Sequence, residues 1–542
     1  MKLFIYYCFY RCLSVCSVVC VFFFAAAALL LAVALSWGVE MTHTFADPLV
    51  DLASVSFQYP HGGGGSAGGI RDVSVRVNGG DRVLVVGHNG SGKSTLLSVI
   101  AGRRKASSGR GTVLGSDAFD DTRLQQHVTL IGRPWPTEAF FATTVDQVTS
   151  QAPLPERKRS VADALHLDLG RDVSNMSSGE RRRVQILHGL LQKSFVYLLD
   201  ECSTDIDIAE RMTVLDLVRS ECVVGDSCCL YATHIFDGVS DWATHLLLMQ
   251  GGMVVDFKRV SDLNAPLEVF VCHFLTRRHR GLFDYTSKRM PVKDAYNDDW
   301  KGGGTVTALP LEKEVVIVCD RLQYRNIFRN LSFTVYRGDR VLLCGCNGAG
   351  KSTLLKMMGG KQFFNNSNGS LRILGKSCYD DMTLNGLVAF GGEWWDTAPP
   401  GEMHVHEMLQ LQTPRAEWLC KVLGVDLSWD VRHISTGEQK HVQLLLHLLE
   451  DKPVILLDEA TSDLDLDQRQ ELLSFLYSES ANRGVSVVYA THIFGGLENW
   501  PTAVMMLDRT TQGLHAIWRG SDVKWAEITR ELIALKGREN VK

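Results

Sequence analysis

Two glycine-rich loops hold the groups of this sequence that are best suited to chemistry. The first reads GHNGSGKST (Gly87–Thr95) and the second reads GCNGAGKST (Gly345–Thr353). In the pattern Gly-x-x-x-x-Gly-Lys-Ser, successive backbone N–H groups cradle phosphate oxygens, and the helix that follows adds its positive N-terminus. Each loop is therefore predicted to bind the phosphates of a nucleotide. The residues predicted to make this contact are Gly87, Asn89, Gly90, Gly92, Lys93, Ser94 and Thr95 in the first loop, and Gly345, Asn347, Gly348, Gly350, Lys351, Ser352 and Thr353 in the second.

Lysine, hydroxyl and carboxylate groups near the loops have the chemistry of a magnesium–ATP site. Lys93 and Lys351 are expected to reach the β- and γ-phosphates. Two aspartates end the apolar runs YLLD and ILLD. A carboxylate in that position is suited to hold Mg²⁺ together with the loop hydroxyl, because Mg²⁺ prefers hard oxygen ligands. The predicted magnesium ligands are Ser94, Asp200, Ser352 and Asp458.

A glutamate and a histidine accompany each aspartate. Glu201 and Glu459 follow the aspartates directly and are predicted to act as general bases that polarise the attacking water. His234 and His492 each lie 33 residues beyond the glutamate, in the same phrase Tyr-Ala-Thr-His. A single histidine at the end of an apolar strand is more often a core residue. Its recurrence beside the predicted γ-phosphate site favours a catalytic role instead.

All of these patterns recur at a constant spacing. In each case the second copy lies 258 residues after the first. This holds for the glycine-rich loops, the phrases MSSGE and ISTGE, the LLDE runs, the YATHIF phrases, and Trp242 and Trp500. Five patterns in one register indicate a gene duplication. We expect one domain over residues 48–265, a linker over 266–310 and a second domain over 311–542.

Short apolar runs alternate with helical patterns in both halves. DRVLVVG and DRVLLCG are typical of buried parallel strands, and KSTLLSVIAG and KSTLLKMMGG are typical of helices that begin at the lysine. FVYLLDE, VILLDE, SCCLYATH and VSVVYATH predict further buried strands. Strands that alternate with helices predict an α/β fold with a parallel or mixed sheet.

The phrases MSSGE (Met176–Glu180) and ISTGE (Ile434–Glu438) resemble the signature loop of ATP-binding-cassette (ABC) proteins, normally Leu-Ser-Gly-Gly-Gln. The resemblance implies two ABC-type P-loop NTPase domains, each with a sheet core and a small helical subdomain. It also implies that each signature loop binds the γ-phosphate held by the other domain, so that the halves form an intramolecular head-to-tail pair around two ATP molecules. Site one would add Ser435, Gly437 and Glu438 to the first P-loop, and site two would add Ser177, Gly179 and Glu180 to the second.

Four other positions match the family. Asp207 and Asp465 match the D-loop aspartates that couple the two sites. Tyr59 and Tyr324 match the aromatic residue that stacks on adenine, although aromatic residues in strands are more often part of the core.

Two features depart from the family pattern. The second signature glycine is replaced by Ser178 in one half and by Thr436 in the other. No glutamine stands at the Q-loop, where the halves read VTLIGRPW and VAFGGEWW. In transporters this glutamine contacts Mg²⁺ and relays to a membrane domain, so its absence from both halves argues against coupling to such a domain.

The phrases HIFDG (His234–Gly238) and HIFGG (His492–Gly496), each followed by a tryptophan, resemble the stand-alone soluble ABC cassettes of fungi, plants and protists. The Gly–Trp segment at the Q-loop and the phrase LGVDLSWDVRHISTGEQKHVQLLLHLL are also similar. The best-known yeast member of this branch associates with the carbon catabolite repressor–Not complex, which regulates transcription and mRNA deadenylation. Members of this branch carry one cassette, so two cassettes imply a monomeric chain that forms its pair internally.

These features are compatible with three alternative functions. The leading one is a cytoplasmic, ATP-hydrolysing switch that acts on a protein partner, with a role in transcription or mRNA regulation. The second is the nucleotide-binding subunit of an ABC transporter, which the missing glutamines disfavour. The third is a ribosome-associated ABC factor. Such factors usually carry a long charged arm between the cassettes, whereas this linker is short and only locally basic.

Composition and the N-terminal stretch set the remaining expectations. The net charge of −5 gives no general reason to expect direct nucleic-acid binding, and the 14 cysteines, which lack zinc-site spacing, are expected to be free thiols. Residues 12–37 carry no charge and could span a bilayer or form part of a signal peptide. We favour Met41 as the true start, because either alternative would separate the ATPase halves from cytosolic ATP. Membrane contact is expected only if residues 12–37 are translated and retained.

Overall fold

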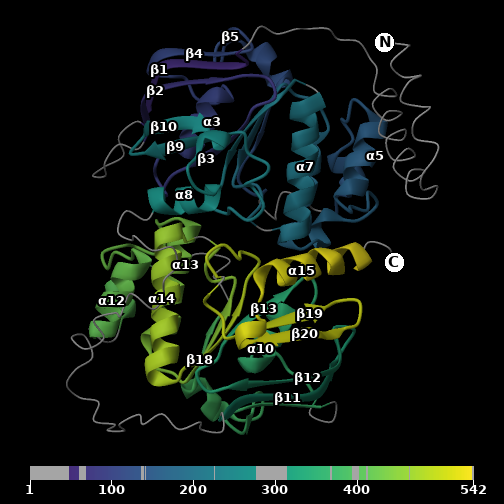
Figure 1. Ribbon diagram of the computed structural model, residues 1–542, viewed down its shortest axis with the longest axis vertical. Coiled ribbons are helices and arrows are strands. Elements are labelled where there is room, and N and C mark those ends of the chain that lie inside the picture. Colours follow the sequence, from purple (N-terminus) through teal and green to yellow (C-terminus); the bar gives the residue numbers. More distant parts are fainter. Residues whose placement is uncertain are drawn as a thin grey trace, which may run out of the picture. The chain divides into compact units, whose positions relative to one another are not determined.

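Strands and helices alternate along both halves of the chain in the computed structural model (Figure 1). The structure describes residues 48–59, 69–135, 140, 142–204, 206–224, 226–275, 314–365, 369–392, 402–409, 413–462, 464–497 and 499–539. The N-terminal apolar segment, the linker beyond residue 275 and the end of the second Gly–Trp segment lie outside the described residues. Residues Asp47–Lys542 form a single compact unit.

A six-stranded mixed sheet forms the centre of each half. In the first half the strand order is β10-β9-β3-β8-β7-β6, and in the second it is β16-β17-β18-β13-β19-β20. All neighbours pair in parallel except the antiparallel edge pairs β9–β10 and β19–β20. The bounds are β3 (Arg82–Val86), β6 (Val128–Ile131), β7 (Val196–Asp200), β8 (Cys228–Ala232), β9 (His245–Gln250), β10 (Met253–Arg259), β13 (Arg340–Gly345), β16 (Val388–Gly391), β17 (Val454–Asp458), β18 (Ser486–Ala490), β19 (Ala503–Asp508) and β20 (Gly513–Arg519).

A four-stranded antiparallel sheet accompanies each central sheet. The orders are β2-β1-β4-β5 and β12-β11-β14-β15. The bounds are β1 (Val50–Gln58), β2 (Gly69–Val77), β4 (Ser108–Val113), β5 (Ser116–Asp117), β11 (Val315–Tyr324), β12 (Phe328–Tyr336), β14 (Ser370–Ile373) and β15 (Lys376–Ser377). The matching orders confirm that the two halves share one α/β fold, as the constant spacing of the motifs predicts.

Helices connect the strands at equivalent places in both halves. In the first half they are α3 (Lys93–Ile100), α4 (Val145–Val148), α5 (Pro155–Ala164), α6 (Ser178–Leu190), α7 (Ile208–Val224) and α8 (Leu267–Leu275). In the second they are α10 (Lys351–Met358), α11 (Val405–Met408), α12 (Pro414–Leu423), α13 (Thr436–Leu449), α14 (Leu466–Arg483) and α15 (Trp525–Glu539). Helices α4 to α6, and α11 to α13, lie between two central strands in the chain, where the small helical subdomain is expected.

Local sequence explains where several helices begin. Pro155 and Pro414 stand in the first turn of α5 and α12, where a missing backbone N–H costs nothing. Ser177 and Ser435 cap α6 and α13 and exchange hydrogen bonds with a glutamate three residues later. The signature phrases therefore encode helix starts as well as candidate chemistry.

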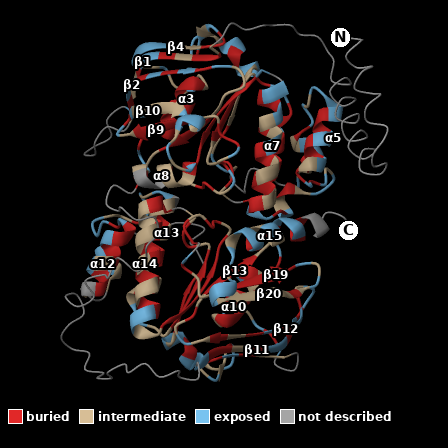
Figure 2. Ribbon diagram, in the orientation of Figure 1, coloured by how far each residue is buried: buried red, intermediate tan, exposed pale blue. Residues whose placement is uncertain are grey.

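The inner strands of each central sheet are almost completely buried, whereas the edge strands β6, β10 and β20 are only partly buried (Figure 2). Every residue of β8 and β18 is buried, which explains why these strands read as continuous apolar runs. The nine cysteines that the structure describes with their surroundings are buried and form no disulfide bonds. Among the described residues, no helix is both long and apolar enough to cross a membrane.

Candidate functional site

The two glycine-rich loops lead from β3 into α3 and from β13 into α10. Gly92 and Gly350 take left-handed backbone conformations (φ 99° and 96°) at the residue that caps each helix. A Cβ atom on Gly350 would lie 2.6 Å from a side-chain carbon of Ile327, so a larger residue would strain the loop. Each loop thus ends with the free N-terminus of a helix, the arrangement that binds phosphate.

The P-loop lysines are buried and folded back on their own loops. Lys93 Nζ donates to the carbonyl oxygens of Gly87 (2.7 Å) and His88 (3.0 Å). Lys351 Nζ donates to the carbonyl oxygen of Gly345 at the same distance, 2.7 Å. Burial lowers the pKa of Lys93, with partial compensation from the carboxylates nearby. Both ammonium groups are held at the loop that is predicted to cradle the phosphates.

A hydroxyl and a carboxylate meet at the end of β7 and of β17, the strands that end in Asp200 and Asp458. Ser94 Oγ donates to Asp200 Oδ1 at 3.0 Å. Burial raises the pKa of Asp200, and it raises the pKa of Asp458 to about 6. Buried carboxylates of this kind are stabilised by a cation, and the donors are the hard oxygens that Mg²⁺ prefers. The residues therefore fit the predicted magnesium ion.

The predicted general bases sit at equivalent, strained positions. Glu201 and Glu459 both have φ of 50°, a left-handed conformation that is uncommon for residues other than glycine. His492 Nδ1 lies 2.8 Å from Glu459 Oε2, and His234 Nδ1 lies 3.4 Å from Glu201 Oε1. Burial opposes ionisation of Glu459, but the neighbouring His492 and Lys351 together lower the pKa of this glutamate. The structure thus brings each predicted base to its predicted histidine.

The two halves meet through the loops that follow the general bases. His234 Nε2 of the first half lies 2.9 Å from the carbonyl oxygen of Ser462 in the second. His492 Nε2 makes the equivalent contact with the carbonyl oxygen of Thr204. Because a carbonyl only accepts, both histidines carry a proton on Nε2. The contact is reciprocal, as a head-to-tail pair requires.

The two D-loop aspartates contact the opposite P-loops. Asp207 Oδ2 accepts from the backbone N–H of Asn347 at 3.5 Å. Asp465 Oδ2 lies 3.8 Å from His88 Nδ1. Each predicted D-loop is therefore next to the P-loop of the other half.

The signature residues occupy helix N-termini. Ser177 Oγ accepts from the N–H of Glu180 (3.3 Å), and Glu180 in turn accepts from the N–H of Ser177 (2.9 Å). Ser435 and Glu438 repeat this exchange on α13. In the described part of the chain, the hydrogen bonds of both serines stay within their own half. The structure does not join them to the opposite P-loop by a hydrogen bond, and their role in a composite site stays a prediction.

The two predicted adenine-stacking tyrosines differ in exposure. Tyr59 is 37% exposed, its hydroxyl lies 3.2 Å from the hydroxyl of Thr95, and the guanidinium of Arg104 lies 4.5 Å from its ring centre. Tyr324 is only 9% exposed and belongs to a hydrophobic core cluster of the second half. A stacking role stays a prediction at both positions, and the geometry favours it more at Tyr59.

One residue that contacts the candidate site was not predicted from the sequence. Arg182 of α6, 2% exposed, donates to the carbonyl oxygens of Glu201 (2.9 Å), Cys202 (2.9 Å) and Gly132 (2.6 Å). It thereby joins the signature helix, the predicted base and the segment that replaces the Q-loop. The repeat does not reveal this residue, because Lys440 stands at the equivalent position and donates to Ser462 instead.

The mixed sheets, the two glycine-rich loops and the buried acidic strand ends define a protein with two P-loop nucleotide-binding domains. A family model described as "ABC transporter" matches residues 70–204 and 328–462, so one copy falls on each half. The chain belongs to the ABC family and carries two ABC domains. Domains of this family generally bind ATP with Mg²⁺ and act as ATPases.

Two similar proteins, one from a plant and one from a yeast, each match about a third of the chain. Over 194 residues the chain is 40% identical to ABC transporter I family member 20 of Arabidopsis thaliana, covering 33% of this chain and 58% of that protein. It is 36% identical over 186 residues to CCR4-associated factor 16 of Saccharomyces cerevisiae, covering 30% of this chain and 64% of that protein. The chain thus matches less than two thirds of the length of either relative. Both relatives are in line with the predicted resemblance.

The solved structures that are similar over most of the chain contain paired cassettes. An RNase-L inhibitor matches with a TM-score of 0.64 and 20% identity, covering 88% of this chain and 93% of that one. The archaeal ribosome recycling factor aABCE1, solved with the ribosomal stalk protein aP1, matches with a TM-score of 0.62, 21% identity and coverage of 88% and 92%. At these identities the similarity concerns the fold alone.

Proposed function

We propose that this protein hydrolyses Mg·ATP at two sites formed between its own two ABC domains, residues 48–265 and 311–542, joined by the linker at 266–310. Each site takes its P-loop, its general base and its histidine from one domain and its signature loop from the other. The observation that carries the proposal is the reciprocal contact of His234 and His492 with the D-loop carbonyls of the opposite half.

The arrangement of side chains suggests how hydrolysis proceeds. Lys93 and the helix N-terminus bind and orient the phosphates, while Ser94 and Asp200 would hold the magnesium ion, which neutralises phosphate charge. Glu201 accepts a hydrogen bond from the attacking water and directs it at the γ-phosphorus. His234, which touches the D-loop of the other half, links this step to closure. The second site has the same roles: Lys351 binds phosphate, Ser352 and Asp458 would hold the magnesium ion, and Glu459 and His492 correspond to Glu201 and His234.

The test is a pair of charge-removing substitutions at the bases. Glu201→Gln with Glu459→Gln should reduce ATP turnover by about 10³-fold or more, because a positioned base and the closed geometry both contribute to the rate. The double variant should still bind ATP and accumulate in a closed state. Chelation of Mg²⁺ from the wild-type protein should likewise abolish turnover. Full turnover in the double variant would refute the assignment of both glutamates.

We further propose that the cycle serves as a cytoplasmic switch on a protein partner, in transcription or mRNA regulation. The similarity to CCR4-associated factor 16 supports this proposal. The missing Q-loop glutamines continue to disfavour a transporter subunit. Affinity purification of the full chain, trapped with the double glutamate substitution, tests the proposal. Recovery of mRNA-deadenylation or transcription factors is expected, and recovery of a polytopic membrane protein would contradict it.

A ribosome-associated role is the second candidate. Two similar structures are described as a ribosome recycling factor with a stalk protein and as a ribosome-bound complex of Pelota and ABCE1. Co-sedimentation of the trapped variant with ribosomal subunits, absent for the ADP-bound wild type, would favour this alternative over the switch in mRNA regulation.

A further inference from the structure

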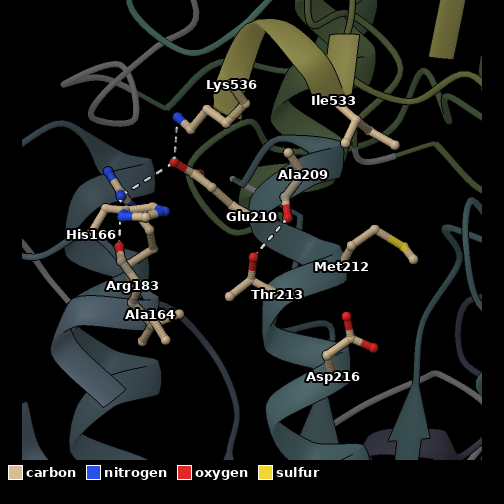
Figure 3. Close-up of a pocket in the computed structure, with 11 residues that line it drawn as sticks. Ala164, His166, Arg183, Ala209, Glu210, Met212, Thr213, Asp216, Ile533 and Lys536 are labelled. Carbon is tan, nitrogen blue, oxygen red and sulfur yellow. Dashed lines mark hydrogen bonds and ion pairs between the residues drawn. The ribbon is translucent and has the colours of Figure 1, made fainter. Parts of the chain in front are cut away.

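A charged cluster joins the last helix of the chain to the first domain. A cavity of about 260 Å³ lies beside it, lined by the end of α5, by α6 and α7 of the first half and by α15 of the second (Figure 3). Lys536 Nζ of α15 lies 3.0 Å from Glu210 Oε1 and 3.4 Å from Asp207 Oδ2. Arg183 approaches the same Glu210 oxygen at 3.3 Å. The side chains of Glu210, Asp207 and Lys536 are 3%, 8% and 11% exposed, so water screens these charges little.

The same aspartate reaches the nucleotide-binding loop of the second half. Asp207 Oδ1 accepts from the N–H of Glu210 at the start of α7, and Oδ2 faces both Lys536 and the N–H of Asn347. Burial opposes ionisation of Asp207, but the ammonium of Lys536, the N–H groups of Glu210 and Asn347 and the charge of Lys351 together lower the pKa of this aspartate. Lys536 therefore helps to hold the D-loop of the first half in the charged, hydrogen-bonded form that contacts the second P-loop.

Among the residues that the structure describes, this cluster is built on one side of the pair; Arg278, which stands at the offset of 258 from Lys536, lies outside them. Residues at the offset of 258 from His166, Arg183 and Glu210 are Gly424, His441 and Gln468, which replaces the carboxylate with a neutral amide. Gln468 Nε2 donates to the carbonyl oxygen of Leu423 in its own half at 3.3 Å. In the first half, Glu210 instead faces Arg183 and the lysine supplied by the second half, as Figure 3 shows.

Lys536 is the side chain that pairs with both carboxylates of the cluster in the paired state. Arg183 approaches Glu210, whereas Lys536 approaches both Glu210 and Asp207. A buried carboxylate that loses an ion-pair partner is destabilised, because water has little access to replace that partner. The D-loop of the first half is therefore expected to keep its position only while α15 is docked.

We infer that Lys536 is a positioning residue for one of the two ATP sites, the one built on Lys351 and Glu459. It acts through Asp207, because the D-loop of the first half contacts Asn347 and, through Thr204, His492 of that site. The inference rests on the proposed function, since it concerns turnover at a proposed site. It makes the sites unequal and places the site of the second half under the control of the C-terminal helix.

The experiment compares Lys536→Gln in two single-site backgrounds. Glu201→Gln leaves only the Glu459 site competent, and Glu459→Gln leaves only the Glu201 site. We expect Lys536→Gln to lower kcat about tenfold in the first background, the size of a typical coupling between sites, with little change in KM. In the second background the change should stay within about twofold. Lys536→Arg, which keeps the charge, should restore most of the loss.

Two further variants test whether the effect comes from the loss of any lysine near α15 or from damage to the fold. Lys524 stands just before α15, is exposed and pairs with Glu527. Lys524→Gln should leave ATP turnover at both sites unchanged. Glu210→Gln combined with Lys536→Met removes one charge of each sign, so the cluster stays balanced and the fold is preserved. This double variant should show the same site-selective loss.

Nucleotide trapping that is read out separately at each P-loop compares the two sites in chains that keep both Glu201 and Glu459. Vanadate-trapped photoreactive ATP should label the peptides of both P-loops in the wild type, and Lys536→Gln should lose label from the Lys351 loop while retaining it at the Lys93 loop. Equal loss at both loops, or no loss at either, would overturn the inference. Absence of ATP turnover and trapping in the wild type would instead refute the proposed function.

Discussion

His234 Nε2 of the first domain lies 2.9 Å from the carbonyl oxygen of Ser462 in the second domain. The same imidazole faces the predicted general base, with Nδ1 3.4 Å from Glu201 Oε1. One ring therefore touches the chemistry of its own site and the D-loop of the partner domain. His492 repeats the arrangement with Thr204 and Glu459. Through these two rings, each site can respond to whether the halves are closed.

Removal of the His234 imidazole should affect the reaction itself. We expect His234→Ala to lower kcat by about 10²-fold, the loss typical of a positioned polar group at a reacting centre. Stability should change little, because the ring is not part of the hydrophobic core. Steady-state ATPase assays in the Glu459→Gln background isolate this site. His433→Ala removes an exposed histidine and should leave the rate unchanged. An equal loss in both variants would contradict the assigned role.

Arg182→Ala should damage both the fold and the active site. The guanidinium holds three carbonyl oxygens, including that of Glu201, and its loss leaves buried acceptors unpaired. We expect the free energy of unfolding to fall by about 2–4 kcal/mol. Arg182→Lys should recover little of the loss, because an ammonium cannot span the three acceptors that the planar fork reaches. Chemical denaturation and ATPase assays measure the two effects.

A matched substitution separates this role from a general charge effect. Lys193→Gln removes an exposed cation shortly after the same helix and should change neither stability nor turnover. If Arg182→Ala lowered stability but left turnover at the Glu201 site intact, the arginine would support the fold without positioning the base.

The repeat explains how much of this structure was predictable. The glycine loops, the acidic strand ends and the histidines each have a fixed local pattern, so their spacing places them at the carboxyl edge of one sheet. The α/β fold followed from the same apolar runs. Arg182 and Lys536 carry no such pattern, because their partners are backbone carbonyls or residues far away in the sequence. Lys440 and the amide of Gln468 also break the repeat at the positions equivalent to Arg182 and Glu210.

Closure of the two domains should depend on pH through His88. The nearby carboxylate of Asp465 raises the pKa of His88, and burial and Lys93 oppose this shift. A raised pKa in the closed state means that closure binds protons. The stabilisation should be complete below the ordinary histidine pKa of about 6.5 and should fade as pH rises through the raised value. The pKa of Asp465 is lowered despite its burial, so its contribution persists until the pH becomes acidic.

Fluorescence transfer between labels on the two domains would measure this dependence. Closure at fixed, subsaturating ATP should weaken between about pH 6 and 8 in the wild type. His88→Gln keeps a polar group at the position but cannot titrate, and its closure should be flat over this range. A wild-type profile that is equally flat would show that the pair does not contribute to closure.

Two buried ion pairs should hold the helical subdomains to helices α7 and α14. Arg157 of α5 lies 2.8 Å from Glu221 of α7, and Arg415 of α12 lies 3.0 Å from Glu479 of α14, all with side chains at most 10% exposed. Arg157→Ala should lower the free energy of unfolding by about 3–5 kcal/mol, because it leaves an uncompensated buried carboxylate.

An exposed pair of the same domain provides the contrast. Arg76 pairs with Asp51 at 3.1 Å, but its side chain is 75% exposed. Arg76→Ala should therefore change the stability of the protein by less than about 1 kcal/mol, since water screens the pair and replaces the lost hydrogen bonds. Urea denaturation of the two variants compares the losses directly. Equal effects would mean that Arg157 is hydrated in solution and does not fasten α5 to α7.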